Sequence, residues 1–539
     1  MIGREKLVFA LSAAALLPLA LWAAPPLPTT PGTVEETLKR PPELKPPPAP
    51  SISAPQPPSA AAPAQGPTVV VSRFEFSGNT VFGADVLAPL VADVVGKPVT
   101  LGQIYQAADR VAEFYARHGY SLASVAVPAQ KIENGVVRLE VIEGRIGRIG
   151  FEGNRRYRDG LLNWFMTRTR SGEVYRAAPL QEDLQTLNAL PGLAARAILK
   201  PGASFGTSDL TIKTQEDPLD ANLILDNYGR KDIGEYRLAG SVTFNNPLTI
   251  ADQLQLLGVH STTNRLNYGD LDYNAPLTSK GLRADLNFGY ARFKVAPPFS
   301  VGGKNENAQF SLIQPFWRRP SSSFLGTAGV IYTKADADLS GLPISATEIT
   351  LMNLGATYTR LWSDSGVTQV SGSLHSDFSK ASASSRNAER LRLELNLQHL
   401  QPLPARLQLL AQFDGVYSPD PLPDTEQFSV GGPTTVRGYP PAEVRGDRGV
   451  FGSLALRRPY AIGPVTLLPR IQADAGQVRR LELPPGADDS DGLVSAGAGL
   501  DVLYRKFDLK LDWDYPIGHK PVSDGRDDGR WYAALSASF

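Results

Sequence analysis

The carboxy-terminal part of the chain, residues 217–539, alternates between apolar and polar positions. In residues 391–398 leucine occupies every odd position and a charged or polar residue every even one. Residues 282–290 and 507–515 follow the same alternation. Because successive side chains of a strand point to opposite faces, this pattern predicts strands with one apolar and one polar face.

Two kinds of β-protein contain such strands. A soluble antiparallel sandwich buries its apolar faces, whereas a membrane barrel turns them to lipid and keeps a polar lumen. Turn signals divide the region into about 16 strands, and bacterial membrane barrels have an even number. Four tryptophans lie near the expected strand ends, where a membrane interface favours them: Trp317, Trp362, Trp513 and Trp531. We therefore expect residues 217–539 to form a transmembrane antiparallel β-barrel in contact with outer-membrane lipid.

The chain ends in an alternating strand whose apolar face contains Trp531, Leu535 and the terminal Phe539. An aromatic residue at the end of the closing strand is typical of outer-membrane barrels, and barrel assembly machinery recognises it. We therefore expect Phe539 to mediate binding to that machinery. Beyond residue 25 the sequence has no apolar stretch of the length that a transmembrane helix needs.

The N-terminus has the features of a secretory signal peptide. Arg4 and Lys6 precede an apolar run that ends in small residues, so we assign residues 1–24 to the signal. The alternative interpretation is a membrane anchor, because the run approaches spanning length.

Residues 25–67 are rich in proline and predict an extended linker without a core. One island within this linker, residues 33–40, can form two turns of helix. Thr33 is its expected N-cap, because Glu36 follows three residues later.

Residues 68–216 show helical and strand periods in turn. The order β-α-α-β-β occurs twice, in residues 68–144 and in residues 145–216. The first strand of each copy ends in a similar motif, Phe76-Ser77-Gly78-Asn79 and Phe151-Glu152-Gly153-Asn154. We interpret the two copies as a duplicated α+β domain.

Composition changes this picture mainly by exclusion. The formal net charge is zero, which argues against nucleic acid as a partner. The chain has no cysteine, so disulfides, thiolate metal sites and a cysteine nucleophile are excluded. None of the five histidines lies at metal-ligand spacing from another ligand residue, and no motif for nucleophilic catalysis or phosphate binding is present. We expect no enzymatic activity, no cofactor and no bound metal.

The longest connection between expected strands, residues 417–447, contains the motif Val436-Arg437-Gly438-Tyr439. Together with two β-α-α-β-β domains ahead of a barrel, this motif resembles the superfamily of POTRA-plus-barrel proteins. The chain looks specifically like the haemolysin secretion/activation family, the outer-membrane transporters of two-partner secretion. The resemblance covers nearly the whole mature chain, including Val127-Pro128-Ala129-Gln130 in the first domain and Asn246-Pro247-Leu248 at the start of the barrel.

The resemblance implies that the long loop folds back into the barrel lumen. Arg437 would then pair with Asp474 on a neighbouring wall strand, close to Gly476. A guanidinium in a confined lumen needs a partner, and a bidentate pair also fixes the loop. The alternative is an exposed loop arginine without a partner. Two positions depart from the family pattern, since Gln472 replaces an aromatic residue and Ala455 a frequent glutamate.

The resemblance also implies function and location. The POTRA domains would lie in the periplasm and bind a secreted partner protein, a large adhesin, cytolysin or toxin, by adding one of its strands to a free sheet edge. The partner would cross the outer membrane through the barrel, which residues 33–40 would plug at rest. The alternatives are a barrel assembly factor of the same superfamily, which usually has three or more POTRA domains, and a plain porin.

Overall fold

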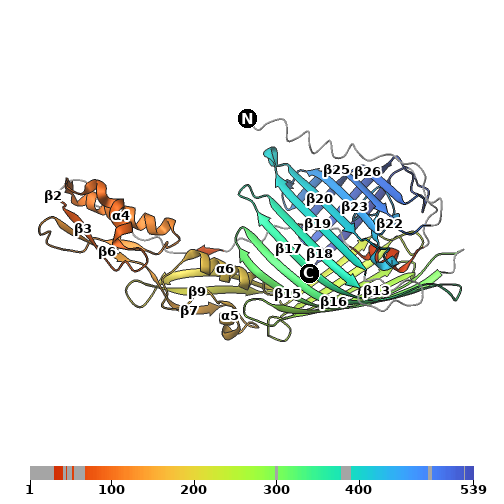
Figure 1. Cartoon of the computed structure of the whole chain (residues 1–539), viewed down its shortest axis with the longest axis horizontal. Helices are drawn as coiled ribbons and strands as arrows, with labels where there is room; N and C mark the ends of the chain where they lie inside the picture. The colour runs from red at the N-terminus through yellow and green to blue at the C-terminus, as the bar shows by residue number, and fades with distance from the viewer. Residues whose placement is uncertain are drawn as a thin grey trace. The chain divides into compact units, whose positions relative to one another are not determined.

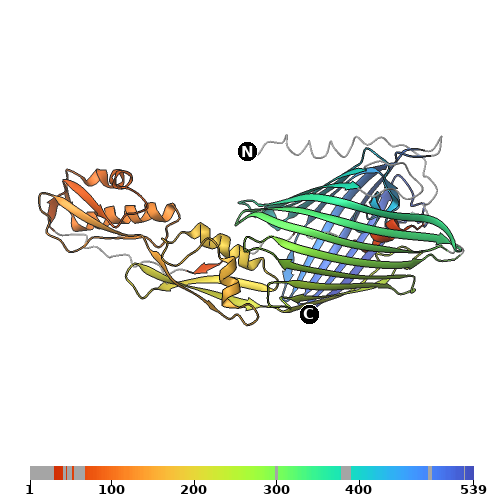
Figure 2. The same cartoon turned by 60° about the horizontal axis from the view of Figure 1, so that its bottom comes forward.

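The computed structural model describes residues 29–39, 44, 51–53, 67–297, 301–377, 390–483, 488–526 and 528–539. The expected signal peptide and much of the expected linker lie outside these residues. The chain divides into two compact units, one built mainly from residues 218–539 and the other mainly from residues 48–217. Each unit is described by itself (Figures 1 and 2). Among the described residues, no helix is both long and apolar enough to cross a membrane.

The larger unit is a closed antiparallel barrel whose first and last strands, β10 and β28, pair with each other. β23 and the short β24 follow one another along the same edge of β25, so seventeen strands occupy sixteen positions around the wall. The prediction of an antiparallel barrel of about 16 strands is confirmed. The strands are β10 (Leu219–Asp226), β11 (Arg237–Asn245), β12 (Gln253–Ser261), β13 (Leu266–Pro276), β14 (Arg283–Lys294), β15 (Val301–Arg319), β16 (Ser322–Leu339), β17 (Leu342–Leu361), β18 (Val367–Asp377), β19 (Leu391–Pro402), β20 (Gln408–Tyr417), β23 (Arg448–Arg457), β24 (Tyr460–Ile462), β25 (Val465–Arg479), β26 (Ser490–Tyr504), β27 (Phe507–Ile517) and β28 (Arg530–Ser538), with the turn η3 (Pro404–Arg406) before β20.

The two faces of the wall differ as the period of two requires. On β19 the side chains of Leu393 and Leu395 are each 45% exposed on the outer face. The Glu394 side chain between them points to the inner face, where its carboxylate lies 3.0 Å from the Arg392 guanidinium. Apolar residues therefore cover the outside of the barrel, and charged residues pair with one another inside it.

The first domain of the smaller unit is a three-stranded sheet with helices packed against it. β3 (Arg73–Ser77) runs parallel to β6 (Val136–Ile142), which pairs antiparallel with β5 (Ser124–Ala126). The remaining elements are β2 (Thr68–Val70), α3 (Ala84–Leu87), η2 (Ala88–Val94), β4 (Pro98–Thr100) and α4 (Leu101–Arg117). The strand expected at the start of this domain is divided into β2 and β3, because Ser72 N bonds to Gly135 O instead of continuing either ladder.

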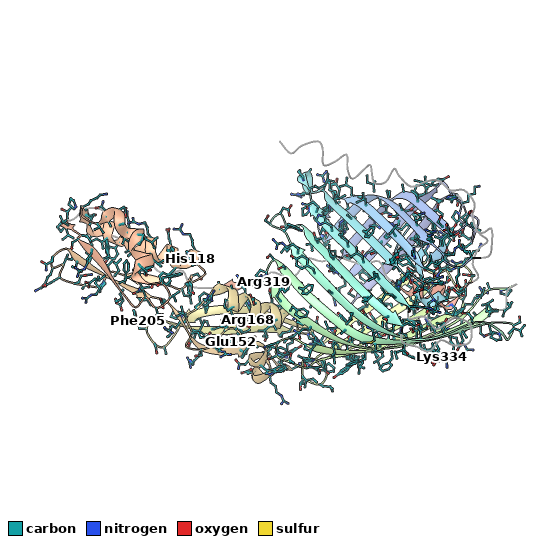
Figure 3. All side chains as sticks on the ribbon, viewed as in Figure 1. His118, Glu152, Arg168, Phe205, Arg319 and Lys334 are labelled. Atoms are coloured by element: carbon teal, nitrogen blue, oxygen red, sulfur yellow. The ribbon has the colours of Figure 1, made fainter. Side chains whose placement is uncertain are left out.

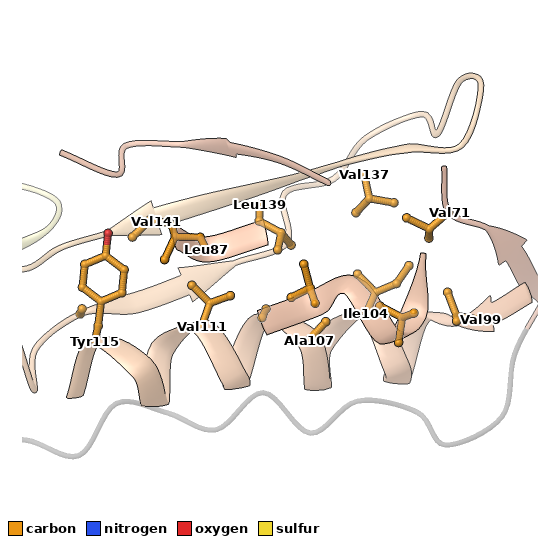
Figure 4. Close-up of a cluster of buried hydrophobic side chains, with 14 residues drawn as sticks. Val71, Leu87, Val99, Ile104, Ala107, Val111, Tyr115, Val137, Leu139 and Val141 are labelled. Carbon is orange, nitrogen blue, oxygen red and sulfur yellow. The ribbon is translucent and has the colours of Figure 1, made fainter. Parts of the chain in front are cut away.

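Helix α4 closes the core of this domain. A capping box holds its start: the Thr100 hydroxyl accepts from Gln103 N, and the Gln103 side chain accepts from Thr100 N. One apolar side of the helix then packs on the sheet (Figure 4). The buried residues that meet there include Ile104, Val111, Tyr115, Val137, Leu139 and Val141.

The second domain repeats this arrangement. β7 (Arg145–Glu152) runs parallel to β9 (Thr207–Glu216), which pairs antiparallel with β8 (Leu193–Pro201). Its helices are α5 (Asp159–Phe165) and α6 (Ala177–Asn188).

The repeated Gly-Asn motif has the same structural role in both domains. Each glycine has a positive φ, 77° in the first domain and 92° in the second, which glycine tolerates best. The next side chain, Asn79 or Asn154, donates to the carbonyl oxygen three residues later, at 2.9 and 2.7 Å. A carboxylate at the end of the opposite strand, Glu143 or Glu216, accepts the free backbone N–H groups of the turn. The motif therefore marks a turn that is built twice.

A short piece of the linker completes the second sheet. β1 (Ile52–Ser53) pairs in parallel with Ala197 and Ile198 of β8, and Ala197 N donates to Ser51 O at 3.0 Å. The edge of β8 is therefore covered by the chain itself over this stretch.

Candidate functional site

The long loop between β20 and β23 lies inside the barrel. It contains the turn η4 (Asp424–Glu426) and a hairpin of β21 (Phe428–Val430) and β22 (Val444–Gly446). Residues of the loop and of the wall form one buried apolar cluster: Val430, Val436, Tyr439, Phe451, Val478 and Leu493. Burial of these side chains against the wall holds the loop in the lumen by the hydrophobic effect.

Arg437, at the tip of this loop, contacts the barrel wall through its whole guanidinium group. Nε and Nη2 donate to the two carboxylate oxygens of Asp474, at 2.8 and 2.6 Å. Nη1 donates to Gln472 Oε1 at 2.7 Å, and Nη2 also donates to Ser453 Oγ at 3.0 Å. Such a bidentate pair fixes the direction of the arginine as well as its charge.

The three other motif residues pack closely against the wall. Val436 and Tyr439 are fully buried, and the Tyr439 hydroxyl donates to His519 O at 2.8 Å. A Cβ atom at Gly438 would lie 2.8 Å from Ser495 Cβ and 2.9 Å from a backbone nitrogen of β27, so no larger residue fits there. Gly476 on β25 is equally constrained, since a Cβ atom there would lie 2.6 Å from a Val430 methyl group.

The wall around Arg437 contains residues that the sequence did not single out as site residues. Gln472 bridges charges of both signs: its oxygen accepts from Arg437 and from Arg470, and its nitrogen donates to Asp512 at 2.8 Å and to Asp514 at 2.9 Å. Polar residues at alternate positions of β25 and β27 are the only sequence signal for this network. The position that departs from the family pattern is thus the centre of the polar network.

A helix from the linker lies in the lumen next to the loop (Figure 1). α2 (Pro31–Leu38) begins two residues earlier than expected, and its N-cap is Thr30, not Thr33. The Thr30 side chain accepts from Thr33 N, and proline at the first helical position supplies a suitable φ. The correction therefore lies in the cap, because the sequence offered two threonines three residues apart.

The start of α2 is bound to the base of the loop. Gly32 N donates to Asp424 Oδ2 at 2.7 Å, and the Thr30 hydroxyl donates to Asp424 Oδ1 at 2.9 Å. Arg445 Nη1 contacts Asp424 and also donates to the Thr30 hydroxyl at 2.9 Å. A side chain at Gly32 would collide with Arg445 and with the backbone of Asp424. One arginine and one aspartate therefore hold the loop and the helix together.

The rest of α2 contacts the barrel wall. Val34 packs into a buried cluster with Leu266 and Phe293. Arg237 donates to the last turn of α2 at Thr37 O. Asn305 Nδ2 lies 3.3 Å from the Glu35 carboxylate. Burial, and then the nearby Glu426 carboxylate, raise the pKa of Glu35 from 4.5 to about 7.

This architecture defines a class of protein: a β-barrel that holds its own long loop and an N-terminal helix in its lumen, preceded in the chain by two small α+β domains. Comparison with known families identifies the particular one. The model described as "Haemolysin secretion/activation protein ShlB/FhaC/HecB" matches residues 206–502, and "POTRA domain, ShlB-type" matches residues 69–144. The chain belongs to the haemolysin secretion/activation family.

Individual relatives agree with this membership. The chain is 24% identical over 485 residues to the outer membrane transporter CdiB of Dickeya dadantii (strain 3937), with 84% of each chain covered. It is 25% identical over 460 residues to the hemolysin transporter protein ShlB of Serratia marcescens, with 80% of each covered. The solved structure of CdiB from Escherichia coli matches in fold, with a TM-score of 0.70 and 20% identity, over 90% of this chain and 94% of that one.

The protein is therefore an outer-membrane transporter of the two-partner secretion type, with its POTRA domains in the periplasm. These findings confirm the predicted family, function and location, and they favour export of a partner over barrel assembly. Because β10 follows the POTRA domains in the chain, it starts on the periplasmic side. Antiparallel strands alternate in direction, so the loop between β20 and β23 starts and ends on the extracellular side.

Proposed function

We propose that the loop and helix α2 together close the barrel at rest, and that export of the partner protein requires the two to separate from each other and to leave the pore. The observation that carries this proposal is the shared lock of Arg445, Asp424 and Thr30, which ties the helix to the loop. Val436, Arg437, Gly438 and Tyr439 would anchor the loop tip to Asp474 and Gly476 on the wall.

The proposed mechanism uses the following division of the chain. Residues 1–24 form the signal peptide, and residues 25–67 form a linker that can carry α2 out of the pore. POTRA 1 comprises residues 68–144, POTRA 2 comprises residues 145–216, and the barrel comprises residues 217–539. The proposal assigns the chain no catalytic step, cofactor, metal ion or nucleic acid.

The partner would be a large secreted adhesin, cytolysin or toxin that arrives in extended form. Strand addition suits such a partner, because backbone hydrogen bonds recognise any extended segment and side-chain pockets add selectivity. The outer edges of β3 and β5 in the first sheet are candidates for this pairing. Phe205, at the tip of the β8–β9 hairpin, is 84% exposed and offers an apolar contact (Figure 3).

A cleavable cross-link tests the gating step. The natural chain has no cysteine, so Thr30→Cys with Asp424→Cys can be joined specifically by a short reducible thiol cross-linker. We expect cross-linked cells to stop exporting the protein encoded beside this gene, and to resume export once the linker is reduced. Each single-cysteine variant, treated identically, is the control. Unchanged export with the cross-link in place would show that α2 and the loop need not separate.

A further inference from the structure

A groove crosses the outer face of the barrel at its extracellular rim. It has a volume of about 790 Å³ and is lined mainly by four neighbouring strands. Figure 1 shows these strands, β19, β20, β23 and β25, side by side in the barrel wall. β20 ends and β23 begins on the extracellular side, which places the groove at the level of the outer leaflet. Its walls are outward-facing apolar side chains: Leu393, Leu395, Phe413, Tyr417 and Val450.

A glycine forms part of the floor of the groove. Gly415 faces outward between Phe413 and Tyr417, at a position where neighbouring strands carry larger side chains. A Cβ atom built there would lie 3.4 Å from the Phe413 ring and 3.8 Å from a Val450 methyl group. The floor is therefore open only because residue 415 has no side chain.

Two arginines lie at the extracellular end of the groove. The Arg448 guanidinium lies 4.6 Å from the centre of the Tyr417 ring, and its Nε donates to Ser418 O at 2.7 Å. No carboxylate among the described residues lies within ion-pair distance of Arg448. Arg479 pairs with Asp489 at 2.7 Å, but both side chains are at least half exposed, so another anion can compete for Arg479.

Arginine stacked on an aromatic ring occurs elsewhere at the rim of this barrel. Arg458 lies over Tyr460 and Arg360 over Trp362, both near the periplasmic ends of strands. Such pairs are common at membrane interfaces. What distinguishes the extracellular groove is the combination of two arginines with an apolar channel whose floor lacks a side chain.

We propose that this groove is a binding site for one phosphorylated glycolipid of the outer leaflet, of the lipid A type. An acyl chain would lie over Gly415 between the aromatic rings. A phosphate group would accept from Arg448 and Arg479, since guanidinium groups bind phosphate through paired hydrogen bonds. The leaflet selects this occupant, because inner-leaflet phospholipids do not reach the extracellular rim.

The proposed lipid site lies next to the base of the long loop between β20 and β23. Ser418 is the first residue of the long loop and Arg448 follows its last residue, and the two contact each other. A phosphate on Arg448 would therefore brace the base of the loop from outside, while Arg437 holds its tip from inside.

Native mass spectrometry of the full-length protein with purified bisphosphorylated lipid A tests the site. We expect the double variant Arg448→Ala, Arg479→Ala to reduce the bound fraction at least about ten-fold, because two charge-assisted contacts are lost. Gly415→Val should reduce binding with both arginines intact, because the new side chain fills the floor. Arg458→Ala with Arg360→Ala, which removes two arginines at the opposite rim, is the matched control and should bind as the wild type does.

Three results would overturn the proposal. The first is wild-type protein without bound lipid A, and the second is an equal loss of binding in the control variant. The third is phosphatidylglycerol binding with the same affinity and the same dependence on Arg448, which would contradict a glycolipid site. Heat-modifiable mobility on gels checks that each variant folds. If the double arginine variant does not fold, lipid A binding by Gly415→Val is compared with that of the wild type instead.

Discussion

At the scale of the residue, the attachment of the loop tip to the barrel wall depends on the shape of the Arg437 side chain. The planar guanidinium of Arg437 reaches Asp474, Gln472 and Ser453 at the same time. A lysine has the same charge but carries it on a compact ammonium group that cannot make the paired contact. Removal of the arginine would leave the Asp474 carboxylate buried without its cation.

We expect Arg437→Ala to lower export about ten-fold or more while the barrel still assembles. The orphaned Asp474 charge costs roughly 3–5 kcal/mol, so the loop loses its fixed position on the wall and would obstruct the lumen instead of leaving it in an ordered step. Arg437→Lys should lie between the alanine variant and the wild type. Export is measured as secreted partner relative to folded barrel in the outer membrane. Arg458→Ala controls for the loss of an arginine, and normal export by Arg437→Ala would remove this residue from the mechanism.

A steric prediction concerns the same loop without changing any charge. Gly476→Ala should loosen the loop, because the new methyl group would lie 2.6 Å from Val430. Overpacking of this kind typically costs about 1–3 kcal/mol. Val430→Ala in the same chain removes the colliding methyl groups and should restore the loop. Protease cleavage within residues 418–447 reports the change, and equal cleavage of the single and double variants would contradict the steric explanation.

At the scale of the element, α2 shows how little of a helix's stability resides in the helix. It has eight residues, too few to be stable alone in water. Its cap, its contact with Asp424 and the burial of Val34 supply the rest. A helix that is stable only when docked is suited to a plug that must leave.

The docking of α2 should depend on pH through Glu35. Its pKa is raised from 4.5 to about 7 in the docked state, so docking retains a proton that the released helix gives up. Docking is therefore favoured at low pH and weakens as the pH rises from about 4.5 towards 7. We expect channel openings in planar bilayers to become more frequent over this range. Glu35→Gln cannot ionise and should flatten the profile; an unchanged profile in this variant would assign the pH dependence to another group.

The sequence predicted elements better than it predicted contacts between them. Strict alternation in residues 391–398 and the repeated Gly-Asn turns depend on local geometry, so they can be read from the chain. The start of α2 was misplaced because Thr30 and Thr33 both qualify as caps. Gln472 and Ser453 could not be linked to Arg437, because which lumen residues are level with the loop tip depends on the stagger of strands around the closed barrel.

At the scale of the whole molecule, the barrel closes through the pairing of its first and last strands. β10 and β28, more than 300 residues apart in sequence, pair through five residues each, and Phe539 N donates to Ala221 O at 2.9 Å. The sequence predicted closure from the even strand number, but not this register. Such distant pairing is slow to form without help, which fits assembly by dedicated machinery.

Deletion of Phe539 separates recognition from stability. Its side chain is 66% exposed on the outer face, so its loss should change the melting temperature of the assembled barrel little. We expect the amount of folded barrel in the outer membrane to fall several-fold if assembly machinery binds this residue. Trp531→Ala removes a similarly exposed aromatic, 63% exposed, at the other end of β28 and is the control. Normal assembly without Phe539 would contradict this role.

The strand β1 affects how readily the transporter associates with itself before the partner protein binds. An unpaired sheet edge can form hydrogen bonds with the same edge of another copy of the protein, which leads to aggregation. The POTRA domains lie in the crowded periplasm, where this risk exists before the partner protein binds. Ile52 and Ser53 shield the edge of β8 with only two residues. A longer incoming strand could form more ladder hydrogen bonds than this stub gives up. The linker strand would thus hinder self-association of the transporter and still allow a strand of the partner protein to displace it.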